Sequence, residues 1–335
     1  MKKVFHFVPS LDIGGVEIAI KKSLPDLKHQ LEISIFYVKR RGSLVVGQRP
    51  WWNALKNIIV DKPDIVITSL WWSHPLGFLF KLSGVRWVCF IHNSRFKHFV
   101  DRCVCTLSLW CADEVAVDSN QAAVFVRSIK SRLNVRVIPY VFLLPQGETE
   151  INRIKNSFIY VGRNAREKRM DLVVGFFKHL LANFPDVTCL LAIASDIPAS
   201  VFGLIEQFGK RVIVKSGLSN NEVFDLLSAA EYFVVLSDLE GFCMTAYEAV
   251  QAGCFVIYRD VGEIKNYVIP GYSFKMANLD NFYNQFDDVF IKRNKNNPVR
   301  VGSAGPKLRS ELGITYISSF MALAEGVDGN KRGSN

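Results

Sequence analysis

The chain has 335 residues, enough for about two domains that each bury their own core, which excludes a disulfide-stapled mini-protein. Hydrophobic residues make up 49% of the sequence and charged residues 21%, a composition typical of an ordered globular protein and not of a disordered one. The net charge of +10 is uneven: residues 1–150 carry 20 − 12 = +8 and residues 151–335 carry 21 − 19 = +2. A basic first half favours anionic partners.

The chain order suggests alternating strands and helices. Strands are expected at residues 4–8, 33–38, 65–68, 87–91, 115–117 and 135–138, and again at 158–161, 187–193, 212–214, 232–236 and 255–258. Helical spacing falls between them, in the first half at residues 16–27, 51–60, 76–82, 96–111 and 121–129. This βαβα order favours parallel sheets with helices on both faces.

Residues 139–154 interrupt the alternation with two prolines, a glycine and no sustained hydrophobic period, as in a linker between domains. We therefore expect an α/β protein with two doubly wound, Rossmann-like domains at residues 1–145 and 155–305. The carboxyl ends of both sheets would face a central cleft, where such folds bind ligands. The tail at residues 325–335 is expected to be loose.

Membrane and metal signals are weak. The uncharged stretch at residues 65–80 is 16 residues long and interrupted by polar residues, which is too short and too polar to span a bilayer. The apolar run at residues 4–8 leads into Asp12 and is predicted as a strand instead of a signal peptide. Seven scattered cysteines without a C-x-x-C pair predict neither a disulfide framework nor a zinc site. A cytoplasmic protein is expected.

Gly14 and Gly15 lie between the first expected strand and helix, where they let backbone N–H groups approach a phosphate or sugar. A tight, capped turn is the alternative. Neither G-x-G nor the P-loop consensus occurs, which argues against NAD enzymes and kinases. In the second half, Arg163 follows a strand and Lys168 precedes a helix, so both can converge on one anion. Solvated loop cations are the alternative there.

The most specific segment is residues 237–253. Glu240 ends a strand-to-helix loop, Gly241 lets that loop pass close to a ligand, and Glu248 lies eight positions after Glu240 in an alanine-rich helix. A carboxylate in an apolar helix needs hydrogen-bond partners, and a pair of ribose hydroxyls would suit it. The helix begins with backbone amides that favour negative charge, those of Phe242, Cys243, Met244 and Thr245.

These segments resemble glycosyltransferase family 4, of the bacterial surface-polysaccharide type, with its two-domain GT-B fold. The motifs that carry the resemblance are Gly14-Gly15-Val16-Glu17, Val161-Gly162-Arg163 with Lys168, Glu240 and Glu248 followed by Ala252-Gly253, and Val261-Gly262-Glu263. Single points in the first half are Ile91-His92-Asn93 and Val117-Asp118-Ser119.

The resemblance implies a retaining glycosyltransferase that moves a sugar from a UDP- or GDP-sugar to a glycan or lipid-linked acceptor. Lipopolysaccharide, capsule or another surface polysaccharide would be the product. No metal and no cofactor besides the nucleotide-sugar co-substrate are implied, and the D-x-D metal anchor of single-domain sugar transferases is absent. The first domain would bind the acceptor, the second the nucleotide sugar, and a helix at residues 306–325 would cross back to the first.

The resemblance also implies residue roles. Arg163 and Lys168 would hold the donor diphosphate and stabilise the leaving group, with Gly14 and Gly15 completing the phosphate side. Glu248 would accept hydrogen bonds from the ribose. Donor-sugar contacts would come from Glu240, the amides after Gly241, and His92, for which a structural role at a strand end is the alternative.

Two positions depart from the family pattern. Arg169 stands where a glycine is usual, and it would either contact a phosphate or point to solvent. The usual glycine after the sixth strand is missing from Pro139-Tyr140-Val141.

Three further expectations concern partners and alternative functions. The tryptophan pairs Trp51-Trp52 and Trp71-Trp72, with the basic series Arg86, Arg95, Lys97 and Arg102, favour an anionic acceptor at a membrane surface, with core tryptophans and solvated charges as the alternative. No nucleic-acid module is recognised, so nucleic acid is not an expected partner. A two-domain sugar-nucleotide epimerase and a non-catalytic nucleotide-sugar-binding subunit remain as other functions.

Overall fold

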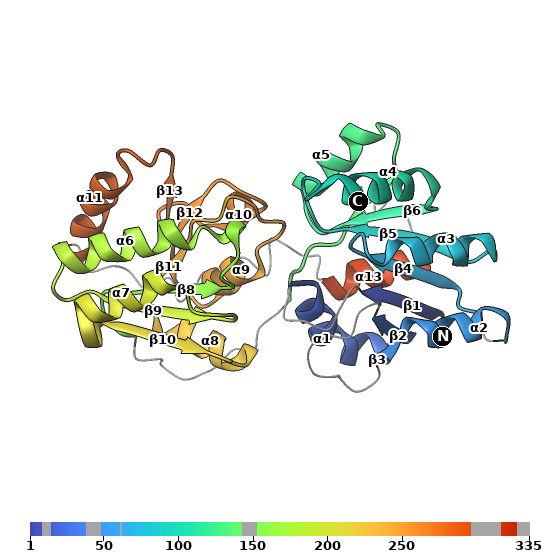
Figure 1. Cartoon of the computed structure of the whole chain (residues 1–335), viewed down its shortest axis with the longest axis horizontal. Helices are drawn as coiled ribbons and strands as arrows, with labels where there is room; N and C mark the ends of the chain where they lie inside the picture. Colours follow the sequence, from blue (N-terminus) through green and yellow to red (C-terminus); the bar gives the residue numbers. More distant parts are fainter. Residues whose placement is uncertain (9–14, 38–47, 61, 143–152, 296–315, 327–335) are drawn as a thin grey trace, which may run out of the picture. The chain divides into compact units, whose positions relative to one another are not determined.

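The computed structural model describes residues 1–8, 15–37, 48–60, 62–142, 153–295 and 316–326. The chain divides into two compact units (Figure 1), one of Met1–Phe142 with Ile314–Asn335 and the other of Leu143–Gly313. Gly14, residues 306–315 of the expected returning helix and residues 327–335 of the expected loose tail lie outside the described residues.

The first unit is built on a seven-stranded parallel sheet with the order β3-β2-β1-β4-β5-β6-β7. Its strands are β1 (Lys3–Val8), β2 (Glu32–Tyr37), β3 (Gln48–Pro50), β4 (Ile65–Ser69), β5 (Arg86–Ile91), β6 (Glu114–Val117) and β7 (Val135–Val137). Its helices are α1 (Gly15–Lys28), α2 (Trp51–Val60), α3 (His74–Leu82), α4 (Phe99–Cys111) and α5 (Asn120–Ile129). The central strands are almost wholly buried, as expected of parallel strands covered by helices on both faces.

Helix α13 (Tyr316–Glu325), near the end of the chain, packs within the first unit beside α1. Figure 1 shows its red ribbon next to the blue strands. Lys2 Nζ donates to the carbonyl of Ala324 at 3.1 Å, and the Arg86 guanidinium donates to the carbonyl of Leu323 at 3.1 Å. Cationic side chains therefore donate to carbonyls of the last helical turn, which no amide four residues further along the same helix can reach.

The second unit has a six-stranded parallel sheet with the order β10-β9-β8-β11-β12-β13. Its strands are β8 (Ser157–Gly162), β9 (Thr188–Ile193), β10 (Val212–Ser216), β11 (Tyr232–Val235), β12 (Phe255–Arg259) and β13 (Ser273–Met276). Its helices are α6 (Met170–Asn183), α7 (Ala199–Phe208), α8 (Asn220–Ala229), α9 (Met244–Gln251), α10 (Ile264–Tyr267) and α11 (Phe282–Lys295).

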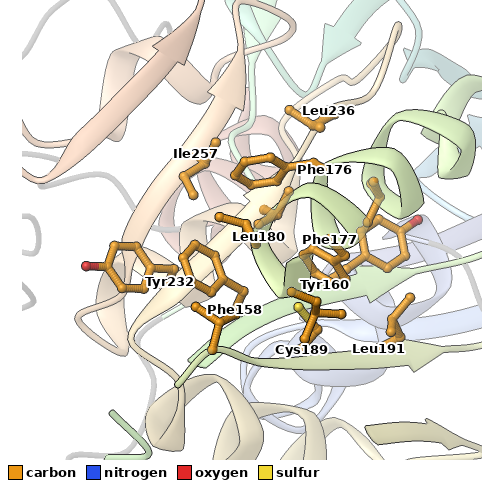
Figure 2. Packing of buried hydrophobic residues seen from close by; sticks show 14 of the residues in the cluster. Phe158, Tyr160, Phe176, Phe177, Leu180, Cys189, Leu191, Tyr232, Leu236 and Ile257 are labelled. Atoms are coloured by element: carbon orange, nitrogen blue, oxygen red, sulfur yellow. The ribbon is translucent and has the colours of Figure 1, made fainter. Parts of the chain in front are cut away.

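Aromatic packing fixes the middle of the second sheet (Figure 2). Phe158 of β8 stacks on Tyr232 of β11 with ring centroids 4.5 Å apart, and Phe176 of α6 lies edge-on to Phe158 at 6.2 Å. All three side chains are at most 2% exposed. Burying one such side chain stabilises the fold by about 1.5–3 kcal/mol. The amino-terminal ends of β8 and β11 are thereby packed together, in the register that pairs Tyr232 with Phe158 and Phe233 with Ile159.

In each sheet the chain first adds strands toward one edge and then crosses over to add the remaining strands toward the other edge. This reversal lies between β1 and β4 in the first unit and between β8 and β11 in the second. Open α/β sheets bind ligands at the carboxyl ends of the strands that flank such a reversal. The prediction of two doubly wound α/β domains is confirmed, and the strand order of the second sheet indicates a ligand site at the loops after β8 and β11.

The structure differs from the sequence expectations in detail. The short edge strands β3 and β13 were not predicted, and helix 96–111 begins only at Phe99. The later start has a local cause, since His98 is the N-cap and its Nδ1 accepts from the Asp101 amide at 3.1 Å. Within the described ranges, no helix is both long and apolar enough to cross a bilayer.

Candidate functional site

The loop after β8 is held so that it presents the Arg163 side chain. Gly162 is required there because a Cβ would lie 2.5 Å from the Tyr160 hydroxyl oxygen. That hydroxyl donates to the Arg163 carbonyl at 3.3 Å, and the Asn164 amide donates to Ser195 Oγ at 2.7 Å. The Arg163 side chain is exposed, and no described residue forms an ion pair with it. Its guanidinium is therefore available to an anion.

Lys168 ends a single 3₁₀ turn, Arg166–Lys168, and reaches across to the loop after β11. Its Nζ lies 2.7 and 2.8 Å from the two carboxylate oxygens of Glu240, which is only 8% exposed. Burial by itself lowers the pKa of Lys168, but attraction to Glu240 outweighs it and the net pKa is raised. The ammonium therefore stays charged, and it has a third N–H for another acceptor.

Arg169 is held by two carboxylates. Its backbone is left-handed, with φ +49°, which is the physical reason why glycine suits this position. The guanidinium is engaged by Asp171 at 2.8 Å and by Asp238 at 3.2 Å, and Arg259 also pairs with Asp238. These ion pairs tie the two loops together, a role that was not expected for Arg169, and the expected phosphate contact stays a prediction.

The loop after β11 is held from a later segment of the chain. Gly262, at φ +60°, packs so closely that a Cβ would lie 2.2 Å from the Gly241 carbonyl oxygen. The Glu263 amide donates to that same oxygen at 3.0 Å. The Tyr267 hydroxyl lies 3.0 Å from the carbonyl oxygens of Phe242 and Cys243, to which it donates. Tyr267 was not predicted, since no sequence pattern links it to this loop.

Helix α9 begins directly after this loop. Cys243 is its N-cap, in a left-handed conformation with φ +57°, and its side chain does not cap the helix. Burial raises the pKa of the Cys243 thiol, which keeps it protonated and unreactive. The amides of Met244 and Thr245 belong to the first turn, where helical N–H groups have no partner within the helix. Glu248 lies half-buried on the same helix.

In the first unit, His92 lies just beyond β5 and is 7% exposed. Its Nδ1 is 2.8 Å from the Tyr140 hydroxyl and 3.6 Å from Asp118 Oδ2, and the His92 and Tyr140 rings are parallel within 7°. Tyr140 thus orients the imidazole. Nε2 is buried and finds no hydrogen-bond partner among the residues described. A buried polar atom of this kind usually has a water or ligand partner.

His92 also lines a cavity of about 20 Å³ with Asn93, Trp71 and Phe96, which has room for about one water molecule and not for a sugar.

Gly15 is the exposed first residue of α1, and Glu17 lies in its first turn. The structure therefore brings Arg163, Lys168 and Glu240 together within the second unit, with Gly241 to Thr245 following on. His92 and Gly15 belong to the first unit. Among the described residues, no cluster of three His, Cys, Asp or Glu could hold a metal ion.

Comparison with known proteins identifies the fold. Residues 146–305 match the family described as glycosyl transferases group 1. Sucrose-phosphate synthase from Thermosynechococcus elongatus is 17% identical with a TM-score of 0.76, over 97% of this chain and 98% of that one. Anabaena Alr3699/HepE in complex with UDP-glucose is 16% identical with a TM-score of 0.74, over 97% and 99%. TarM is 11% identical with a TM-score of 0.76, over 97% and 98%.

No curated protein was found to match the chain. At identities of 11–17%, the structural likeness shows the fold and not the activity. The chain therefore has the GT-B fold, and its second unit, which carries the Arg163, Lys168 and Glu240 cluster, is similar to the group 1 glycosyl transferases.

Proposed function

We propose that this protein is a retaining, metal-independent glycosyltransferase that uses a nucleoside diphosphate sugar. The observation that carries the proposal is the meeting of Arg163, Lys168 and Glu240 at the order reversal of the second sheet. Two cations beside a buried carboxylate suit a ligand that has both a diphosphate and sugar hydroxyls. The group 1 family match over this unit supports the same function, and the UDP-glucose complex of Alr3699/HepE favours a uridine donor.

The diphosphate would bind through the free Arg163 guanidinium and the third N–H of Lys168. As the bond from the anomeric carbon to the diphosphate breaks, negative charge grows on the leaving group. The two cations, together with the first amides of α9, would stabilise that charge. In other transferases a bound metal ion stabilises the charge instead. Because fixed loops hold the positive charge, little reorganisation is needed during the reaction.

The sugar and ribose would be held by the carboxylates. Glu240 keeps lone pairs beyond the two contacts with Lys168 and would accept from donor-sugar hydroxyls. Glu248 would accept from the ribose hydroxyls. His92, oriented by Tyr140, would offer Nε2 to the donor sugar. Gly14 and Gly15 would complete the phosphate side. The acceptor would be a glycan or lipid-linked hydroxyl in surface-polysaccharide synthesis, with the protein in the cytoplasm.

The test is transfer of label from radiolabelled UDP-glucose and GDP-mannose into a bacterial glycolipid extract, with and without EDTA. We expect label in the lipid fraction from one donor, unaffected by EDTA, with the sugar's anomeric configuration retained in the product. Arg163→Ala should abolish transfer. Arg166→Ala is the matched control, because Arg166 is an exposed arginine on the same loop.

Other outcomes would assign other functions. An epimerase would change the sugar without any acceptor, and a binding subunit would bind the nucleotide without turnover. Inversion of the anomeric configuration, or loss of transfer in EDTA that Mg²⁺ restores, would contradict the retaining and metal-independent parts of the proposal.

A further inference from the structure

Helix α4 of the first unit has two apolar sides. Its inner side packs into the core through Cys105 and Leu109, which are 7% and 1% exposed. Its outer side carries a second apolar stripe at helical spacing. We call this stripe the α4 face, and it consists of Phe99 (78% exposed), Val100 (52%), Cys103, Leu107 (55%) and Trp110 (61%). A surface helix of a globular protein normally carries polar residues on that side.

The apolar surface continues beyond the N-terminus of α4. His98, the N-cap of the helix, lies edge-on to Trp71 with ring centroids 4.9 Å apart. Trp71 in turn stacks on Trp72 at 4.3 Å, and Trp72 is 55% exposed. At least one tryptophan of this pair is therefore a surface residue and not a core residue. Contiguous exposed aromatic and aliphatic groups mark interaction surfaces.

The charge around the α4 face is predominantly positive. Arg95, Lys97 and Arg102 are exposed, and Lys130 Nζ lies 4.9 Å above the Trp110 ring. Between residues 65 and 112 the only acidic residue is Asp101. That carboxylate is 3% exposed and turned inward, accepting from the Lys97 amide at 2.7 Å and from the Cys105 thiol. The exposed carboxylate of Asp113, just after the helix, is paired with Lys81.

We propose that the α4 face binds the surface of an anionic lipid bilayer, with α4 lying in the membrane plane. The 13-residue helix is about 20 Å long, and its aromatic and aliphatic side chains would enter the acyl boundary. The surrounding lysine and arginine side chains would contact anionic headgroups. Tryptophan favours this interface because its indole ring is largely apolar but carries one polar N–H.

The predominantly positive charge favours a lipid surface over a second copy of the same chain, since two such faces would repel each other. The inference deepens the proposed function by naming the surface where the enzyme would meet a lipid-linked acceptor. Only this link to the acceptor rests on the proposed function; the binding of lipid does not. Lipid binding can be measured without turnover, so failure of one proposal can be told apart from failure of the other.

The experiment is flotation of the full-length protein with sonicated vesicles, either phosphatidylglycerol with phosphatidylethanolamine or phosphatidylcholine alone. We expect binding to the anionic vesicles, loss of most of it in 0.5 M NaCl, and little binding to phosphatidylcholine. The double variant Leu107→Ser/Trp110→Ser should bind at least tenfold more weakly, and so should the triple variant Arg95→Glu/Lys97→Glu/Arg102→Glu.

The control is Phe202→Ser/Ile291→Ser, which removes two apolar side chains of the second unit that are 51% and 42% exposed. It should bind vesicles like the wild type. All changes are on surface residues, and circular dichroism would verify folding. The proposal is overturned if the wild type does not float with anionic vesicles, or if both α4 variants float as well as the control. A dimer that dissociates in the Leu107→Ser/Trp110→Ser variant, without vesicle binding, would assign the face to a second copy instead.

Discussion

Replacing Gly262 with alanine should damage the loop after β11 far more than an ordinary glycine substitution does. The new Cβ would lie 2.2 Å from the Gly241 carbonyl oxygen, whereas ordinary contact begins at 3.4 Å, so one segment must move by 3.4 − 2.2 = 1.2 Å. A left-handed alanine adds about 1–2 kcal/mol of strain, and forced overpacking adds about 1–3 kcal/mol. We expect Gly262→Ala to lower the free energy of unfolding by about 3 kcal/mol.

Gly271→Ala provides the matched control. Gly271 is also left-handed, with φ +82°, but a Cβ added to it would meet no atom within 4 Å. Only the backbone strain of about 1–2 kcal/mol should remain. All six tryptophans lie in the first unit, so tryptophan fluorescence does not follow unfolding of the second. Calorimetric melting is the suitable assay for stability, and titration calorimetry for nucleotide binding.

The two variants should also differ in nucleotide affinity. Because the Gly262 contact includes Glu240 Cβ at 3.0 Å, the alanine displaces the carboxylate that holds Lys168. We expect at least a tenfold weaker affinity for the donor nucleotide in Gly262→Ala and less than a twofold change in Gly271→Ala. Equal effects of the two substitutions on melting and on binding would refute the reasoning.

Three further predictions concern buried polar groups. Lys168→Met leaves the carboxylate of Glu240 unpaired and should destabilise the protein by about 3 kcal/mol. Adding Glu240→Gln should recover much of this loss, and additive effects in the double-mutant cycle would count against the pair. Burial lowers the pKa of both His6 and His74 to about 3, so the unfolded chain binds protons first as the pH falls below about 6.5. The free energy of unfolding of the first unit should then fall by up to about 1.4 kcal/mol per pH unit for each histidine. Urea unfolding followed by tryptophan fluorescence measures this, and equal midpoints at pH 7 and pH 5 would argue against it. Tyr267→Phe removes the hydroxyl that donates to two loop carbonyls, so it should lower the free energy of unfolding by about 1–2 kcal/mol and also weaken donor affinity. Unchanged melting and unchanged binding by calorimetry would contradict the role given to Tyr267.

The sheets could be predicted from sequence because parallel strands are buried on both faces and therefore form short, nearly continuous apolar runs. Strand β1 is an example, with five of its six residues buried. The edge strands β3 and β13 could not be predicted in this way. They contain three and four residues, and β13 has only one buried residue, so neither has an informative pattern.

The site was predictable as far as it depends on strand ends. Arg163, Lys168 and Glu240 lie near the carboxyl ends of β8 and β11, and the strand order of the sheet makes those strands neighbours. The pairing of Lys168 with Glu240 was not predicted, since both were assigned to the donor. Their pairing gives each residue a structural role besides the proposed binding role.

The residues that orient the site were missed because their partners are distant in sequence. Tyr140 contacts His92 from 48 positions away, and Tyr267 contacts Phe242 from 25 positions away. The pairing of Arg169 with Asp238 was missed for a similar reason, since the two residues are 69 positions apart. Side-chain pairs of this kind follow from tertiary packing, for which neither periodicity nor local motifs carry a signal.

The central claim is that Arg163 and Lys168 form a donor-diphosphate site that works without a metal. The most direct measurement is the thermal shift of the purified protein with UDP, GDP, ADP and CMP, each with and without EDTA, beside an Arg163→Ala/Lys168→Ala variant. Ligands that bind only the folded state raise the melting temperature. We expect a rise with one diphosphate, UDP by our proposal, that persists in EDTA and is absent from the variant. No shift with any nucleotide, or a shift that the variant retains, would contradict it.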